Sequence, residues 1–255
     1  MSKIIAIINQ KGGVGKTTTA VNLAAGVGIC GKKVLLIDAD PQGNTTSGYG
    51  ISKKEIEYSS FDLLTSGAHA KEAAIPTKFK NVSVIPANID LAGAEIALIN
   101  VQKRESQLKT ALALIKNDYD YIFIDCPPSL GLITINALTA ADSFLVPAQC
   151  EYYALEGLAQ LIATVKRVKQ AFNPDLYLEG VVLTMFDGRL NLTQQVVHEL
   201  KKHFADELYK TTIPRGVRLS EAPSYGSPIQ YYDARCKGAD AYNTLAKEFI
   251  KRNKK

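Results

Sequence analysis

The sequence predicts an α/β fold, in which one doubly wound, mostly parallel twisted sheet is covered by helices on both faces. Three observations predict this fold. Short apolar runs rich in β-forming residues alternate with segments whose apolar residues recur at helical spacing. The run at residues 4–8 is apolar throughout, which indicates a strand buried on both faces. A glycine-rich segment follows that run directly and leads into the first helical pattern.

The elements are predicted in chain order from these patterns. Strands are expected at residues 4–8, 34–37, 82–85, 121–124, 144–146 and 180–185, which are short runs bounded by polar residues or turn signals. Helices are expected at residues 17–27, 107–116, 130–141, 155–172 and 192–204. Residues 44–80 are the least regular part and are expected to form loops with short helices. No linker divides the chain, so residues 1–255 are predicted to be a single domain.

Composition narrows the class of protein. The four cysteines lack any C-x-x-C pair, which argues against a zinc site or a disulfide framework and favours reduced thiols. No N-terminal signal pattern and no apolar run of about 18–20 residues is found, so a cytoplasmic location is expected. Charge is uneven: residues 1–188 hold 17 Lys and Arg against 18 Asp and Glu, whereas residues 189–255 hold 13 against 7. This basic last quarter suggests an anionic partner, with a solvated basic surface as the alternative.

The segment at residues 10–18 predicts a phosphate-binding loop. It reads Gln10-Lys11-Gly12-Gly13-Val14-Gly15-Lys16-Thr17-Thr18. The glycines let backbone N–H groups approach an anion at a helix N-terminus, a lysine reaches the β- and γ-phosphates, and a threonine hydroxyl suits Mg²⁺. The expected ligand is a nucleoside triphosphate with magnesium. The pattern departs from G-x-x-x-x-G-K-[ST] because Gln10 holds the first glycine position and a second lysine, Lys11, follows it.

Carboxylates follow two of the predicted strands. Asp38 and Asp40 come after the strand at 34–37, and Asp125 comes after the strand at 121–124. Because ligands bind at the carboxyl ends of such strands, Asp125 is predicted to hold Mg²⁺, through the water molecules that the ion binds. Of the other two, Asp38 is assigned to the metal shell and Asp40 to orienting the attacking water. Together with the loop, these residues predict nucleoside triphosphate hydrolysis.

The chain resembles the deviant Walker A ATPases of the ParA/MinD family. The resemblance rests on the loop at residues 11–17, on Asp38-Ala39-Asp40-Pro41-Gln42, and on Asp125-Cys126-Pro127-Pro128. Two further segments, at residues 149–157 and 213–223, look like the chromosomal ParA, or Soj, branch. The resemblance covers nearly the whole chain.

The resemblance implies a mechanism and partners. It implies that Lys11 reaches the partner's bound phosphates in an ATP-dependent homodimer, where its charge stabilises the transferring phosphoryl oxygens. It also implies slow ATP hydrolysis, stimulation by a ParB/Spo0J-type centromere-binding protein, and nonspecific binding of double-stranded DNA at the nucleoid. Arg189 and Arg218 match the DNA-contacting arginines of the branch. Adenine is expected near Pro214 and Gly216, where a glycine leaves only backbone contacts.

Three alternatives remain at this point. A MinD-like membrane-cycling ATPase shares the nucleotide site, and residues 238–252 place apolar side chains at helical spacing beside lysines. Because this pattern runs almost to the end of the chain, packing of that helix onto the sheet is the favoured expectation. A metabolic enzyme on the same core is disfavoured because the cysteines lack cluster-ligand spacing. A DNA-binding module without hydrolysis is disfavoured by the carboxylates and by the lack of an N-terminal DNA-reading domain.

Overall fold

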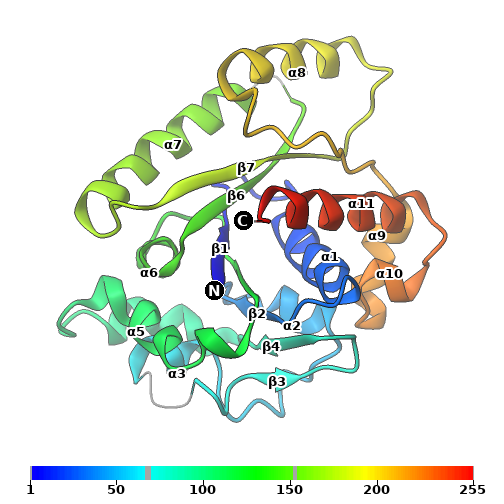
Figure 1. Cartoon of the computed structure of the whole chain (residues 1–255). Coiled ribbons are helices and arrows are strands. Elements are labelled where there is room, and N and C mark those ends of the chain that lie inside the picture. The colour runs from blue at the N-terminus through cyan, green and yellow to red at the C-terminus, as the bar shows by residue number, and fades with distance from the viewer. Residues whose placement is uncertain (1, 67–69, 152–153, 255) are drawn as a thin grey trace.

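A seven-stranded sheet forms the centre of the molecule, with the strand order β3-β4-β2-β5-β1-β6-β7 (Figure 1). The computed structural model describes residues 2–66, 70–151 and 154–254. The strands are β1 (Lys3–Ile7), β2 (Val34–Asp38), β3 (Ile75–Pro76), β4 (Val82–Ile85), β5 (Tyr121–Asp125), β6 (Ser143–Gln149) and β7 (Tyr177–Thr184). All neighbours pair in parallel except β3 and β4. The predicted doubly wound, mostly parallel sheet is therefore confirmed.

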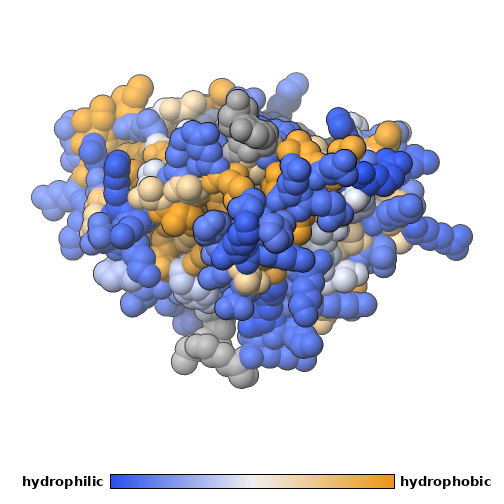
Figure 2. Space-filling view, turned by 90° about the horizontal axis from the view of Figure 1, so that it is seen from above, coloured by the Kyte–Doolittle hydropathy of each residue, from blue (hydrophilic) through white to orange (hydrophobic). Residues whose placement is uncertain are grey.

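Helices cover both faces of the sheet (Figure 1). They are α1 (Lys16–Ile29), α2 (Asn44–Gly48), α3 (Ser60–Thr65), α4 (Ala94–Ala97), α5 (Gln107–Ala113), α6 (Leu132–Ala140), α7 (Ala154–Ala171), α8 (Asn191–Phe204), α9 (Val217–Glu221), α10 (Ile229–Tyr232) and α11 (Lys237–Arg252). Short 3₁₀ helices occupy Ile89–Gly93, Arg104–Ser106, Lys116–Asp118 and Ala222–Tyr225. On the outside, hydrophilic side chains alternate with smaller hydrophobic patches on the face seen in Figure 2.

Two hydrophobic cores lie on opposite faces of the sheet, because successive side chains of a strand point in opposite directions. In β1, Ile5 and Ile7 pack into the core formed with α1 and α11. Ile4 and Ala6 pack into the other core, with α3 and α5–α8. Burial of alternate residues on both faces explains why the strand is apolar throughout.

The C-terminal helix α11 buries its apolar face. Tyr242, Leu245, Ala246 and Phe249 are at most 1% exposed, and the Phe249 ring contacts Tyr121 and Phe123 of β5. The expected packing of residues 238–252 onto the sheet is confirmed, so this face is not presented to lipid. None of the described helices is long and apolar enough to cross a membrane.

The structure adds elements that the sequence pattern did not reveal. β3 lies within residues 44–80, where loops and short helices were expected, and the predicted helix at 107–116 ends at Ala113. A strand of two residues, one of them proline, and helices of four or five residues contain no complete hydrophobic period. Parts of two sequence segments, residues 67–69 and the Tyr152-Tyr153 pair of the 149–157 motif, lie outside the described residues.

Candidate nucleotide-binding site

The loop between β1 and α1 has the backbone geometry of an anion cradle. Gly13 and Gly15 have φ of 74° and 84°, in the left-handed region that favours glycine. Gly15 is the N-cap of α1 and provides no side-chain hydrogen bond. The first N–H groups of α1 therefore have no side-chain cap and are available to bind an anion. Thr184, at the end of β7, donates from Oγ1 to the Val14 carbonyl (2.8 Å) and anchors the loop.

Lys16 is held inside the loop. Its side chain is 7% exposed, and Nζ donates to the Lys11 carbonyl (3.1 Å). Burial lowers the pKa of Lys16, while the negative charge of Asp125 opposes this shift. A buried ammonium beside a glycine-rich loop can form strong, charge-assisted hydrogen bonds with phosphate oxygens. Gly12 is exposed, and Thr17 and Thr18 lie half-buried in the first turn of α1.

The extra lysine has a different environment. The Lys11 side chain is 52% exposed, and its ammonium forms an ion pair with Glu151, which follows β6. Its backbone N–H donates to Asn9 Oδ1 (3.0 Å). Lys11 therefore lies at the surface of the molecule, with its ammonium held by Glu151.

Sheet register brings the predicted carboxylates to this loop. Asp38 of β2 pairs with Asp125 of β5, and Asp125 pairs with Ile7 of β1, the last strand residue before the loop. The carboxyl ends of three adjacent parallel strands thus meet at one edge of the sheet. The structure places the ends of β2 and β5 beside the phosphate loop, as predicted.

Asp125 has one oxygen atom without a partner. The Thr45 hydroxyl donates to Oδ2 (2.8 Å), whereas Oδ1 is buried and accepts no hydrogen bond from the described residues. Burial raises the pKa of Asp125 to about 7, with a further contribution from the charge of Asp38. A buried, unpartnered carboxylate oxygen beside the Thr17 hydroxyl fits a hydrated Mg²⁺, since hard cations take oxygen ligands.

The other two carboxylates differ from each other. Asp38 is fully buried; Oδ2 accepts from the Thr46 hydroxyl (2.7 Å) and N–H (2.8 Å), and Oδ1 accepts from the Asp40 N–H (3.2 Å). Burial raises the pKa of Asp38 to about 6. Asp40 is only partly buried and its Oδ1 accepts from the Gln42 N–H (2.9 Å). Of these two, Asp40 has the carboxylate with the greater access to solvent.

Replacing Asp125 by Asn is expected to stabilise the protein without nucleotide. Because the folded-state pKa of about 7 exceeds the ordinary value of 3.8, ionisation costs the folded state stability as pH rises between these values. We expect Asp125→Asn to raise Tm by roughly 3 °C or more at alkaline pH, with little difference below the ordinary pKa. Scanning calorimetry of the nucleotide-free protein measures the change in Tm, and Asp175→Asn, at an exposed residue, is the control. If the Tm of Asp125→Asn at alkaline pH is unchanged or lower, the pKa of Asp125 is not raised by burial.

The two predicted DNA-binding arginines lie on adjacent segments. The Phe186 N–H donates to the Ile213 carbonyl (2.9 Å), which places the loop after β7 beside the segment before α9. The Arg189 side chain is 89% exposed, and its guanidinium donates two hydrogen bonds to the Asp187 carboxylate (2.9 and 2.6 Å). Arg218 pairs with Glu221 (2.9 Å) and lies 3.5 Å from Asp233. Each guanidinium is solvent-accessible and already has a carboxylate partner.

The residues expected near adenine line a small cavity. Pro214 and Gly216 border a space of about 190 Å³, together with Leu219, Cys236 and Gly238. The cations Arg215, Arg218 and Lys237 also border it. Its size and mostly apolar walls suit a flat heterocycle.

Three residues of the site were not identified from the sequence. Thr45 and Thr46 hold Asp125 and Asp38, and Glu151 holds Lys11. Thr45 and Thr46 lie in the region of least regular pattern, and a hydroxyl pair there carries no specific signal. Glu151 lies 140 positions from its partner, so only the fold brings the two charges together.

Comparison with known proteins gives consistent findings. A family profile described as an AAA domain matches residues 2–178. The chain is 60% identical over 248 residues to the sporulation initiation inhibitor protein Soj of Bacillus subtilis, covering 97% of this chain and 98% of that protein. It is 51% identical over 253 residues to the chromosome partitioning protein ParA of Myxococcus xanthus, covering 99% and 89%.

Solved structures share the fold. A cobyrinic acid a,c-diamide synthase from Mycobacterium smegmatis with bound ADP and magnesium has a TM-score of 0.85 and 37% identity, covering 98% of this chain and 95% of that one. The septum site-determining protein MinD of Pyrococcus horikoshii, complexed with Mg-ADP, has a TM-score of 0.79 and 27% identity, covering 97% and 96%. Both are nucleotide complexes on the same architecture.

Proposed function

Because the chain belongs to the ParA/MinD family of ATPases, and within it to the Soj branch, we propose that this partitioning ATPase is a DNA-binding switch driven by ATP. The observation that carries the proposal is that the ends of β2 and β5, which carry Asp38, Asp40 and Asp125, lie beside the loop that holds Lys16. The loop supplies N–H donors, and the strand ends supply acidic groups for the metal and for water.

ATP with Mg²⁺ is the proposed ligand. The N–H groups of residues 12–18 and Lys16 bind the β- and γ-phosphates. Thr17 and Asp125 hold Mg²⁺, which neutralises charge on the phosphate oxygens when it is bound. Asp38 already accepts three hydrogen bonds within the chain. It therefore contributes negative charge to the outer coordination shell of Mg²⁺ and does not bind the ion directly. Pro214 and Gly216 contact adenine through their backbone.

For hydrolysis, Asp40 orients the attacking water and accepts its proton. Lys11 of one subunit leaves Glu151 and reaches the phosphates bound by the partner in an ATP-dependent homodimer. Because each site is completed by the other subunit, turnover depends on dimerisation. Hydrolysis separates the subunits, and a ParB/Spo0J-type protein accelerates this step.

The ATP-bound dimer is proposed to bind double-stranded DNA of any sequence, which would associate it with the nucleoid. Arginines that face phosphates provide affinity without reading bases. Dimerisation doubles the number of arginines on one surface, which explains how a nucleotide can control DNA binding.

The switch is tested by measuring DNA binding of the purified protein without nucleotide and with ADP, ATP or a nonhydrolysable ATP analogue. DNA binding is expected only with ATP and with the analogue. The DNA complex formed with the analogue should last longer than the one formed with ATP. Equal binding in all four states contradicts a nucleotide-controlled switch.

Reversing the charge of Arg189 and Arg218 together is expected to weaken DNA binding equally for all sequences. The slope of log affinity against log salt should become shallower by roughly 0.9 for each DNA phosphate that the protein no longer neutralises. Lys109→Glu with Lys116→Glu is the matched control, because it makes the same change in net charge on exposed residues of another region. Unchanged affinity in the Arg189→Glu, Arg218→Glu protein would show that DNA binds elsewhere.

Two alternatives are less well supported. The apolar face of α11 is buried in the core, which removes the feature that favoured a MinD-like membrane cycle. The diamide synthase has the same fold, but the identity of 37% to it is well below the 60% to Soj. Vesicle sedimentation with ATP tests the first alternative directly.

A further inference from the structure

The two arginines assigned to DNA are each paired with an acidic side chain of the same subunit. The Arg189 guanidinium donates from Nε and Nη2 to the two carboxylate oxygens of Asp187 (2.9 and 2.6 Å). The Arg218 guanidinium donates from Nη1 to Glu221 Oε2 (2.9 Å), and its Nε lies 3.5 Å from Asp233 Oδ2. Both positive charges are therefore balanced within the subunit.

The Asp187 carboxylate occupies donors that a DNA phosphate would use. An arginine binds phosphate as it binds carboxylate, through two parallel N–H donors. Asp187 already takes one such pair of donors on Arg189. A phosphate that binds the same donors has to displace Asp187, and it then lies beside a negative charge that repels it. DNA binding through Arg189 therefore competes with an anion of the protein itself.

Further hydrogen bonds hold both acidic side chains in place. Asp187 Oδ1 also accepts from the Arg189 N–H (3.1 Å), which closes a short turn between the two residues. The hydrogen bonds from Arg189 lower the pKa of Asp187 to about 2, so its carboxylate is charged at neutral pH. Glu221 Oε2 accepts from the Tyr232 hydroxyl (3.1 Å). Neither acidic group depends on a guanidinium alone for its position.

The pairing is selective among neighbouring cations. Arg215, Arg218 and Lys237 border the same cavity of about 190 Å³. Within the part of the chain that the structure describes, Arg218 is the one of these three that forms an ion pair. The unpaired cations can attract DNA from a distance, because no carboxylate balances their charge. Arg218 contributes its full charge only after Glu221 is displaced.

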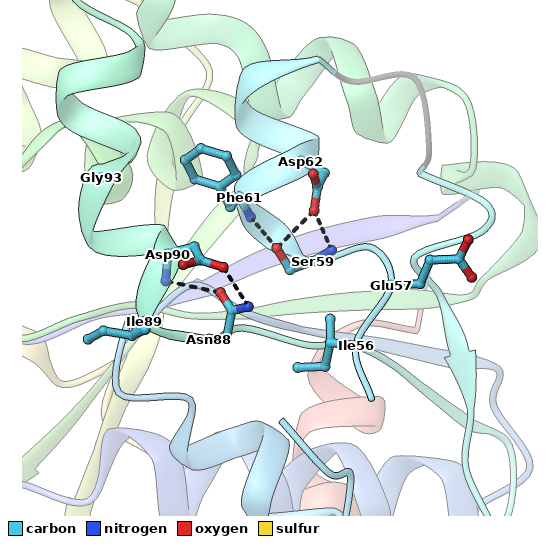
Figure 3. A pocket seen from close by; sticks show the side chains of 9 residues that line it. All are labelled: Ile56, Glu57, Ser59, Phe61, Asp62, Asn88, Ile89, Asp90 and Gly93. Carbon is cyan, nitrogen blue, oxygen red and sulfur yellow. Dashed lines mark hydrogen bonds between the residues drawn. The ribbon is translucent and has the colours of Figure 1, made fainter. Parts of the chain in front are cut away.

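Acidic residues on another surface lack such partners. Figure 3 shows a cavity of about 580 Å³ between α3 and the segment after β4, whose nine lining residues include Glu57, Asp62 and Asp90 and no basic residue. Asp62 accepts from the Ser59 N–H (2.7 Å) instead of from an arginine. Removing a charge from this surface changes the net charge of the protein without releasing a cation. The exposed Glu57 is therefore suitable for a control variant.

We propose that Asp187 and Glu221 compete with DNA phosphate inside each subunit. Each holds its own arginine back, which keeps the DNA affinity of a single subunit low. DNA is then retained only when a dimer combines the arginines of two subunits. This inference rests on the proposed function, because it concerns the regulation of the same arginines. It excludes the opposite role, in which the carboxylates position the arginines for DNA and are needed for binding.

The test measures binding of the full chain to a fluorescent DNA duplex of arbitrary sequence by anisotropy, without nucleotide and with an ATP analogue. Asp187→Asn with Glu221→Gln is expected to raise DNA affinity by about fivefold or more. The slope of log affinity against log salt should become steeper by roughly 0.9 for each additional phosphate neutralised. Both amides can still accept the hydrogen bonds from the Arg189 N–H and the Tyr232 hydroxyl, so the fold is preserved.

Asp175→Asn with Glu57→Gln is the matched control, because it makes the same change in net charge on exposed residues elsewhere. Its DNA affinity is expected to change by less than about twofold. If Asp187→Asn with Glu221→Gln binds DNA as the control does, or more weakly than the unchanged chain, the proposal is overturned. Weaker binding would mean that the carboxylates position the arginines.

A double-mutant cycle separates competition from a general effect of charge. Asp187→Asn alone is expected to raise DNA affinity by about threefold or more in the unchanged chain. In the Arg189→Ala protein it should have little effect, because no guanidinium remains to be released. An equal gain in both proteins contradicts competition between Asp187 and DNA.

Immobilised heparin, a sulfated polyanion, distinguishes failure of this inference from failure of the proposed function. Asp187→Asn with Glu221→Gln should elute from heparin at higher salt than the unchanged chain and the control variant. If this order holds but the unchanged chain with the ATP analogue binds no DNA, the proposed function fails and the internal competition stands. If the unchanged chain binds DNA but all three proteins elute together, the competition fails and the proposed function stands.

Discussion

Asp40→Ala is expected to bind ATP and dimerise normally while its turnover falls by about 10²–10⁴-fold, the usual contribution of a general base. Asp40 is the more accessible of the two carboxylates after β2, and its Oδ1 is held by the Gln42 N–H. It is therefore placed to orient water without supporting the core. Asp38, which is fully buried and bonded to Thr46, is unsuited to receiving a proton from solvent water.

Single-turnover hydrolysis, nucleotide titration and sedimentation of the ATP complex measure these three properties separately. Asp40→Asn is the sharper variant, because the amide oxygen still accepts from Gln42 but the side chain is no longer a base. Turnover of Asp40→Asn near that of the unchanged protein would show that another residue orients the water.

Lys16→Ala is expected to abolish nucleotide binding at ordinary concentrations. Removing one partner of a buried, hydrogen-bonded charge pair costs about 2–5 kcal/mol, or roughly thirtyfold to several thousandfold in affinity. Lys16 is 7% exposed and held at the loop, so no solvent cation can replace it. Titration calorimetry with ATP and Mg²⁺ measures the loss. Near-normal affinity would place the phosphates outside this loop.

Lys11→Ala is the matched control, since it removes a second lysine from the same loop. Its ammonium contacts Glu151 and lies on the surface, so the affinity of a single subunit for ATP should change little. ATP turnover by the dimer should nevertheless be lost, because the charge supplied to the partner's phosphates is missing. If both lysine variants lose ATP affinity equally, the two lysines do not have separate roles.

The sequence was sufficient to predict the sheet and its two covered faces. The apolar run at 4–8 and the glycine loop after it reflect burial and backbone constraints that act over a few residues. The two-residue strand β3 and the short helices between residues 217 and 232 were missed. β3 is held by pairing with β4, and the short helices are held by contacts with distant segments, such as the hydrogen bond from the Ile229 N–H to Asn22 Oδ1 (2.7 Å), rather than by a local pattern.

The sequence by itself determined the loop, the acidic strand ends and the family, because each is a short motif whose chemistry depends on neighbouring residues. Only the tertiary structure decided what surrounds them. It paired Asp38 with Asp125 through sheet register, placed Thr46 on Asp38, and brought Glu151 to Lys11. Burial raises the pKa of both Asp38 and Asp125. Burial and long-range charge contacts depend on how the whole chain packs, and no local pattern of residues encodes them.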